Sequence, residues 1–151
     1  MTFTCRVYGL PVAQGSKHPF RNKATGKIQM VESSKRLKPW RQEIAAVATD
    51  QMSGPPWTTP VSVWANFIFS RPAGHYGSGR QANVLKPSAP GVPAGRKNDL
   101  EKLVRALHDA LTGIVFRDDG QVVRLHAQKV YGDRPAVEIE VAEWSDTAEP
   151  L

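Results

Sequence analysis

The stretch from Asp99 to Gly113 places its apolar residues on one side of a helical wheel and its polar residues on the other. The apolar side holds Leu100, Leu103, Val104, Ala106, Leu107, Ala110 and Leu111. The polar side holds Glu101, Arg105, His108 and Asp109. This spacing predicts an amphipathic helix that covers a core with one face and ends at Thr112 and Gly113.

Segments rich in β-branched and aromatic residues predict a sheet around this helix. These segments are residues 2–10, 61–69, 122–131 and 137–141, with a hairpin over 17–31 and an extended stretch at 115–116. Apolar residues at helical spacing predict a second helix from Leu37 to about Ser53. We therefore expect an α+β fold, a single domain over residues 1–151 with a mixed sheet of about five strands and two main helices.

Charge is distributed unevenly along the chain. Residues 1–97 carry fourteen Lys and Arg against three Asp and Glu, whereas residues 98–151 carry six against eleven, which gives +11 and −5. A basic surface attracts polyanions, so nucleic acid is a reasonable partner of the first part. A protein that only coats phosphate has little use for the carboxylates of the second part. A metal ion bound by these carboxylates would reconcile the acidic part with the basic one.

Two basic segments contain the candidate DNA contacts. In the hairpin these are Lys17, Arg21, Lys23 and Lys27. Residues 72–97 contain four Pro and five Gly but no Asp or Glu, which predicts a mobile basic loop. Its candidate contacts are Arg80, Lys86, Arg96 and Lys97. A solvated edge hairpin and a solvated loop are the simpler explanations of the two segments.

Several classes of protein are disfavoured by what the sequence lacks. No apolar run is long enough to cross a membrane, and the first residues do not have the pattern of a secretory signal. Cys5 has no partner for a disulfide, and the four His have no zinc-binding spacing. No phosphate-binding glycine loop is found. We expect a cytoplasmic protein with no membrane partner and no nucleotide cofactor. His108 is expected to be solvated.

Carboxylates can gather at the start of the helix that begins near Asp99. Residues two apart in a regular helix point about 200° away from each other, so Asp99 and Glu101 reach one ion only if Asp99 precedes the first turn. A helix of about 14 residues carries the chain about 21 Å, and residues 113–118, if extended, return about 20 Å. Asp118 and Asp119 are therefore expected back at the helix start. Helix capping and a plain turn are the simpler roles of these acids.

Three motifs follow one another in fixed order in this part of the chain. They are Asp99-Leu100-Glu101-Lys102-Leu103, Asp109-Ala110-Leu111-Thr112-Gly113, and Asp118-Asp119-Gly120-Gln121-Val122-Val123 with Lys129. Together they resemble the RusA family of Holliday junction resolvases, common in phages and prophages, and the resemblance implies a bacterial host cell. The close match covers residues 98 to about 141. The resemblance implies a homodimer with two metal sites that binds branched DNA and nicks opposing strands of a four-way junction.

The family binds magnesium through three acidic residues, which are matched here by Asp99, Glu101 and Asp119. The resemblance also places Arg105 at a catalytic basic position, where relatives usually have Lys, and Glu101 where they usually have Asp. Because Arg cannot act as a base at ordinary pH, Arg105 would act electrostatically. Asp118 is expected just behind the ligands, held by Arg117 or Lys129.

The implied activity is hydrolysis of a DNA phosphodiester by water that Mg²⁺, or Mn²⁺ in its place, activates. The chain would then be a crossover junction endodeoxyribonuclease of recombination, repair or phage genome processing. Two alternatives stay open. One is a catalytically impaired junction-binding protein of the same fold, and the other is a nuclease for flaps, RNA or other branched nucleic acid.

Overall fold

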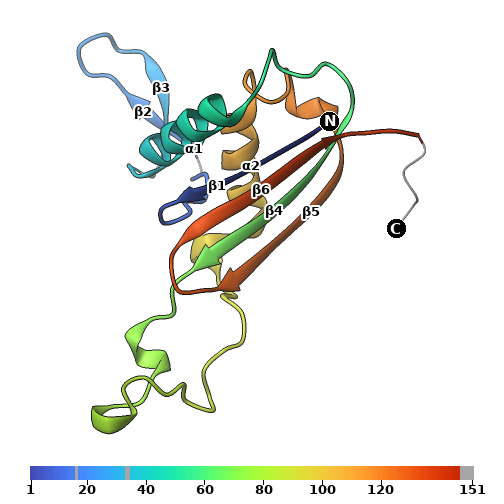
Figure 1. Ribbon diagram of the computed structural model, residues 1–151. Helices are drawn as coiled ribbons and strands as arrows, with labels where there is room; N and C mark the ends of the chain where they lie inside the picture. Colours follow the sequence, from blue (N-terminus) through green and yellow to red (C-terminus); the bar gives the residue numbers. More distant parts are fainter. Residues whose placement is uncertain (16, 33–34, 147–151) are drawn as a thin grey trace.

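The computed structural model of the chain describes residues 1–15, 17–32 and 35–146 (Figure 1). Its strands are β1 (Thr2–Tyr8), β2 (Lys17–Arg21), β3 (Ile28–Glu32), β4 (Val61–Phe69), β5 (Val122–Tyr131) and β6 (Ala136–Glu143). Its helices are α1 (Leu37–Gln51) and α2 (Leu100–Leu111), with short 3₁₀ turns η1 (Ala73–His75), η2 (Gly79–Gln81), η3 (Arg96–Asn98) and η4 (Asp119–Gln121). None of the helices in these ranges has both the length and the apolar character that crossing a bilayer requires.

One mixed sheet contains four strands in the order β1-β6-β4-β5. β6 pairs antiparallel with β1 and with β4, whereas β4 pairs parallel with β5. β2 and β3 form a separate hairpin that projects beside α1 in Figure 1. The predicted α+β class with two main helices is confirmed. In the described part of the chain, the main sheet has four strands rather than about five, because the hairpin arms pair with each other.

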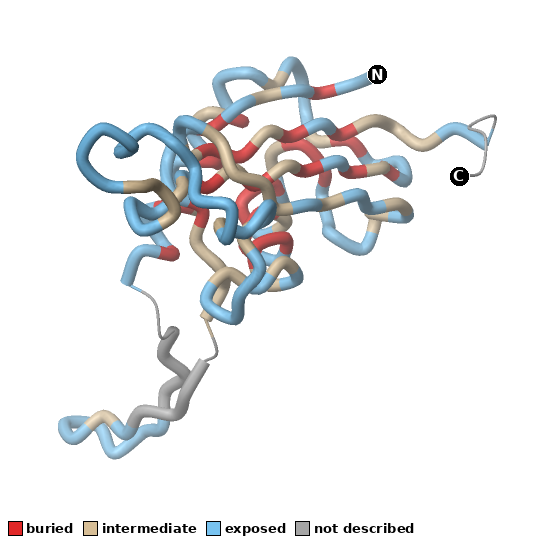
Figure 2. The backbone as a smooth tube through the Cα atoms, turned by 90° about the horizontal axis from the view of Figure 1, so that it is seen from below, coloured by how far each residue is buried: buried red, intermediate tan, exposed pale blue. Residues whose placement is uncertain are grey.

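The core lies between one face of the sheet and the two main helices. Alternate residues of β4 face it, namely Val61, Val63, Ala65, Phe67 and Phe69. The predicted apolar stripe of α2 is buried there as Leu103, Val104, Ala106, Leu107, Ala110 and Leu111. α1 adds Leu37, Trp40, Ile44 and Ala48. Figure 2 shows this buried centre and the exposed segments that extend from it.

The chain turns tightly after α2. Gly113 has a φ of 83°, a left-handed conformation that glycine adopts without strain, and its N–H donates to the Phe116 carbonyl at 2.7 Å. The buried Phe116 pairs through its backbone with Trp57, just before β4. Residues 113–118 are thus held at the C-terminal end of α2, and β5 begins there.

Residues 70–99 leave the sheet at the end of β4 and return at the start of α2. The segment contains η1, η2 and η3, and hydrogen bonds between its own residues hold it together. The Lys86 N–H donates to the His75 carbonyl at 2.9 Å, and the Arg71 side chain donates to the Pro90 carbonyl at 2.7 Å. This loop, at the bottom of Figure 1, therefore has local structure, and its mobility stays a prediction.

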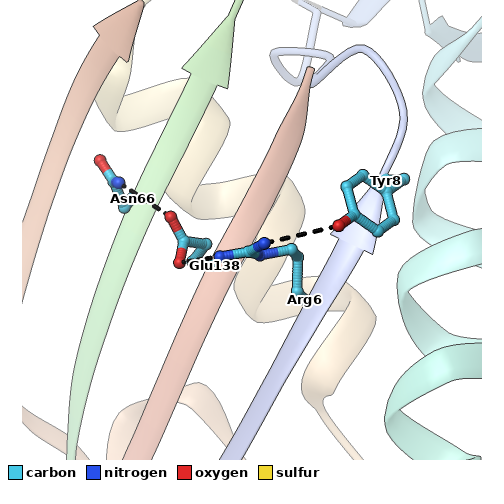
Figure 3. A network of polar contacts seen from close by, with 4 residues as sticks. All are labelled: Arg6, Tyr8, Asn66 and Glu138. Carbon is cyan, nitrogen blue, oxygen red and sulfur yellow. Dashed lines mark hydrogen bonds and ion pairs between the residues drawn. The ribbon is translucent and has the colours of Figure 1, made fainter. Parts of the chain in front are cut away.

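The other face of the sheet carries polar side chains linked across three strands (Figure 3). Arg6 of β1 forms an ion pair with Glu138 of β6 at 2.8 Å and donates to the Tyr8 hydroxyl at 3.4 Å. Asn66 of β4 donates to the second Glu138 oxygen at 3.3 Å. The hydrogen bond from Arg6 lowers the pKa of Glu138 and also lowers the pKa of Tyr8.

Acidification should weaken this network. Because the folded-state pKa of Glu138 lies below its ordinary value of 4.5, its contribution to stability is present above that value and is lost as pH falls through the folded-state pKa. We expect the Tm of the wild type to fall more steeply below about pH 5 than that of Glu138→Gln, by a small amount because the pair is exposed. Melting curves from about pH 6 to 3 would test this, and parallel Tm profiles would contradict it.

Candidate functional site

Asp99 lies immediately before the first turn of α2, where the sequence required it to be for metal binding. It is the N-cap residue, and its Oδ1 accepts a hydrogen bond from the Lys102 N–H at 3.2 Å. The residue is exposed. A capping carboxylate has a second oxygen, so capping and ligand binding are compatible roles for Asp99.

Glu101 and Arg105 lie one turn apart on the exposed side of α2. Their closest oxygen and nitrogen atoms are 3.6 Å apart, and their side chains are 84% and 55% exposed, respectively. An ion pair this exposed is held weakly, so either side chain can turn to another partner. Glu101 also lies in the first turn, where the helix dipole favours a negative charge.

Asp118 caps η4, the short turn that begins at Asp119 and leads into β5. The Asp118 Oδ1 accepts from the Gly120 N–H at 2.7 Å, and the Asp118 N–H donates to the Gln121 Oε1 at 2.8 Å. The second bond forms a capping box together with the Gln121 N–H, which donates to the Asp118 side chain. Asp118 therefore stabilises its own turn, which leaves the adjacent Asp119 exposed at the start of the turn.

Asp119 lies at the opposite end of α2 from Asp99. β5 starts just after Asp119 and ends beside the start of α2, where Lys129 Nζ donates to the Asn98 carbonyl at 2.7 Å. A strand rises about 3.3 Å per residue, so the two ends of β5 are more than about 20 Å apart. The expected return of Asp119 to the helix start is wrong within one chain, because residues 113–118 form a tight turn. Among the described residues, no three His, Cys, Asp or Glu lie close enough to hold a metal ion.

Lys129 lies at the start of α2 and not beside Asp118. The bond from Lys129 to the Asn98 carbonyl brings a positive charge close to Asp99. The expected contact of Lys129 with Asp118 is therefore wrong, because the two residues belong to opposite ends of β5. The basic residue instead joins the helix-start carboxylates.

His108 is half-buried near Asp119, although we expected it to be solvated. Its ring packs edge-on against Phe116, with centroids 6.2 Å apart, and its Nε2 is buried without a hydrogen-bond partner among the described residues. Burial lowers the pKa of His108, and the charges of Asp119 and Asp109 oppose this shift. The helical wheel missed this because Phe116, from beyond the helix, covers the ring.

The candidate DNA-contacting cations occupy separate regions of the surface. On the hairpin, the exposed ones are Arg21, Lys23 and Lys27. Lys17 lies in β2, and its side chain falls outside what the structure describes. In the long loop, the exposed ones are Arg80, Lys86, Arg96 and Lys97. The last two belong to η3 and directly precede the helix-start carboxylates, so the structure brings cations and acids together there.

The start of α2 thus combines two exposed carboxylates, Asp99 and Glu101, with the exposed cations of η3 in an α+β fold. The sequence matches the family described as Endodeoxyribonuclease RusA over residues 9–142. It is also similar to a protein of Bacillus subtilis (strain 168) described as "Uncharacterized protein YqaN", with 31% identity over 144 residues, 92% of this chain and 94% of that protein. The chain belongs to the RusA endodeoxyribonuclease family. Membership indicates hydrolysis of DNA phosphodiester bonds and confirms the resemblance seen in the sequence.

Proposed function

We propose that the protein is a magnesium-dependent endonuclease that resolves four-way DNA junctions by paired symmetric nicks. The observation that carries this proposal is the pair of exposed carboxylates, Asp99 and Glu101, directly after the cations of η3. Oxygen ligands beside a basic surface suit metal-assisted cleavage of a phosphodiester. Membership of the RusA family supports DNA as the substrate.

The proposed ligands suit a hard divalent cation. Asp99, Glu101 and Asp119 offer carboxylate oxygens on exposed residues. Mg²⁺ prefers oxygen ligands, keeps several waters and is held by few carboxylates, and Mn²⁺ accepts the same ligand type. The bound ion would supply Lewis acidity and a water of lowered pKa.

In this proposal the third ligand comes from a second protomer. Since Asp119 is far from Asp99 within one chain, a complete set of three acids requires two copies. In a two-fold dimer, Asp119 of the partner subunit would join Asp99 and Glu101, which gives two equivalent sites. Val123 and Leu125 are apolar, exposed and close in sequence to Asp119, which supports a protein contact in this region. Two equivalent sites suit the near two-fold symmetry of a four-way junction.

The basic residues near the carboxylates would stabilise charge. Arg105 keeps its proton at any ordinary pH, so it donates hydrogen bonds and cannot accept a proton from water. From its position one turn after Glu101, it would contact the phosphate as negative charge develops there. Lys129, held at the Asn98 carbonyl, adds positive potential close to Asp99.

The candidate DNA-contacting cations of the hairpin and the long loop would bind the DNA backbone without reading its sequence. They are Lys17, Arg21, Lys23 and Lys27 in the hairpin, and Arg80, Lys86, Arg96 and Lys97 in the loop. Contacts of this kind go to phosphates and depend strongly on salt. This electrostatic binding is independent of the metal ligands, so binding and cleavage can be measured apart.

A panel of substrates tests the proposed function. The purified protein is mixed with a synthetic four-way junction, a flap, a linear duplex and an RNA duplex, each with Mg²⁺, Mn²⁺ or a chelator. We expect cleavage of the junction above all, in symmetric pairs, and only with metal. Junction binding without cleavage would favour the catalytically impaired alternative. Preferred cleavage of the flap or the RNA would favour a nuclease of different specificity.

A further inference from the structure

A concave pocket of about 630 Å³ opens beside the start of α2. Its walls include residues 10–15 after β1, the ends of β4 and β5, Pro93 and residues 96–98. Its volume falls within the range of pockets that bind small molecules. The pocket adjoins Asp99, because Lys102 lines it and the Lys102 N–H donates to the Asp99 carboxylate at 3.2 Å.

The charged part of the lining is cationic. It contains Arg36, Arg96, Lys97 and Lys102. No carboxylate occurs among the described residues that line the pocket. Three of the four cations are exposed and only Lys102 is half-buried, so they are accessible to an anion that reaches the pocket from solvent. Such a lining favours a phosphate group.

The rest of the lining is apolar apart from Gln14, Ser70 and Asn98. Its apolar side chains include Pro11, Val12, Phe69 and Tyr131. Gln14 also lines the pocket, and its Oε1 is buried without a hydrogen-bond partner among the described residues. An unpaired buried acceptor is costly, so a ligand that donates a hydrogen bond to it would be favoured. A side-chain amide also matches the donor and acceptor edges of a nucleobase.

We propose that this pocket receives one unpaired nucleotide of the DNA, with its phosphate at the cations and its base against the apolar wall. The proposal rests on the proposed function, since it takes DNA as the ligand. A base inside a duplex is stacked and paired, and must leave the stack to enter a pocket of this kind. An unpaired nucleotide at a branch point avoids much of that cost. Its capture would place the adjoining backbone next to Asp99.

The binding test uses two matched junctions in the presence of chelator, so that no cleavage occurs. One junction is fully paired, and the other has a single extra unpaired nucleotide at the branch point. We expect the wild type to bind the second junction about tenfold more tightly, because less unstacking is required. Fluorescence anisotropy gives both dissociation constants.

Two variants alter the pocket in different ways. Ser70→Tyr adds bulk at an exposed lining position, and Gln14→Leu removes the amide at nearly constant volume. Both are expected to lose the preference for the unpaired nucleotide. The matched control is Lys86→Ala, a loop cation outside the pocket lining, which should weaken binding of both junctions equally. Melting curves check that each variant is folded.

Equal affinity of the wild type for the two junctions would overturn the proposal, as would a preference kept by both pocket variants. Loss of the preference in Ser70→Tyr alone would support the pocket and remove Gln14 from the contact. If Ser70→Tyr fails to fold, Gln14→Leu decides. Since binding is measured without metal, a failure of nuclease activity in the substrate panel leaves this result standing, and the two proposals can fail separately.

Discussion

Asp99→Asn is expected to abolish nicking of a four-way junction while junction binding survives. The substitution replaces a charged oxygen ligand with an amide, so we expect the cleavage rate to fall at least about a thousandfold, a barrier increase of about 4 kcal/mol. Asn caps a helix about as well as Asp, so the hydrogen bond from the Lys102 N–H should persist and Tm should hardly change. Single-turnover cleavage, anisotropy and thermal melts measure the three quantities.

The matched control for this variant is Asp109→Asn on the same helix. Asp109 is exposed and lies 3.5 Å from Arg41, away from the helix start. Its substitution should leave nicking near the wild-type rate, because an exposed ion pair contributes little. Wild-type nicking by Asp99→Asn would refute the ligand assignment.

A mixture of two inactive variants should regain activity. If each metal site combines Asp99 of one protomer with Asp119 of the partner subunit, a heterodimer of Asp99→Asn and Asp119→Asn has one intact site and one site that lacks both residues. Random exchange at equal concentrations makes half of the dimers mixed, so we expect about one quarter of the wild-type number of sites. The product should be single nicks, because only one site per dimer is active.

The control for the mixing experiment is a double variant, with both substitutions on one chain, mixed with the wild type. That heterodimer has two impaired sites in the proposed arrangement, one lacking Asp99 and the other lacking Asp119. Activity should then come only from the remaining wild-type dimers, again about one quarter of the sites, but with paired nicks. Failure of the first mixture to regain any activity, with exchange verified by mass spectrometry, would disprove sites built from two protomers.

Local patterns were sufficient to predict the elements that carry the site. The one-sided apolar spacing of residues 100–111 predicted α2, and those residues are the ones that cover the sheet. The geometry of a regular helix also predicted that Asp99 can share an ion with Glu101 only if it precedes the first turn, and Asp99 is indeed the N-cap. Both inferences rest on short-range geometry, which a sequence determines directly.

The positions that required long-range information were predicted less well. Chain length permitted Asp119 to return to the helix start. However, the backbone pairing of Phe116 with Trp57 holds the turn at the C-terminal end of α2. The same turn covers His108, which a helical wheel alone places in solvent. Burial by a residue from another element and the choice among permitted chain paths depend on tertiary packing, which sequence spacing does not report.

The length of β5 has a consequence for where the two strands of a junction are cut. In the proposed dimer, each protomer gives Asp119 to one site and Asp99 to the other, so the separation of the two sites equals the distance that β5 spans within a protomer. That distance is more than about 20 Å and is set by a paired, hydrogen-bonded strand. The length of β5 would thus set the offset between the two nicks. That offset would be a property of the protomer rather than of the DNA.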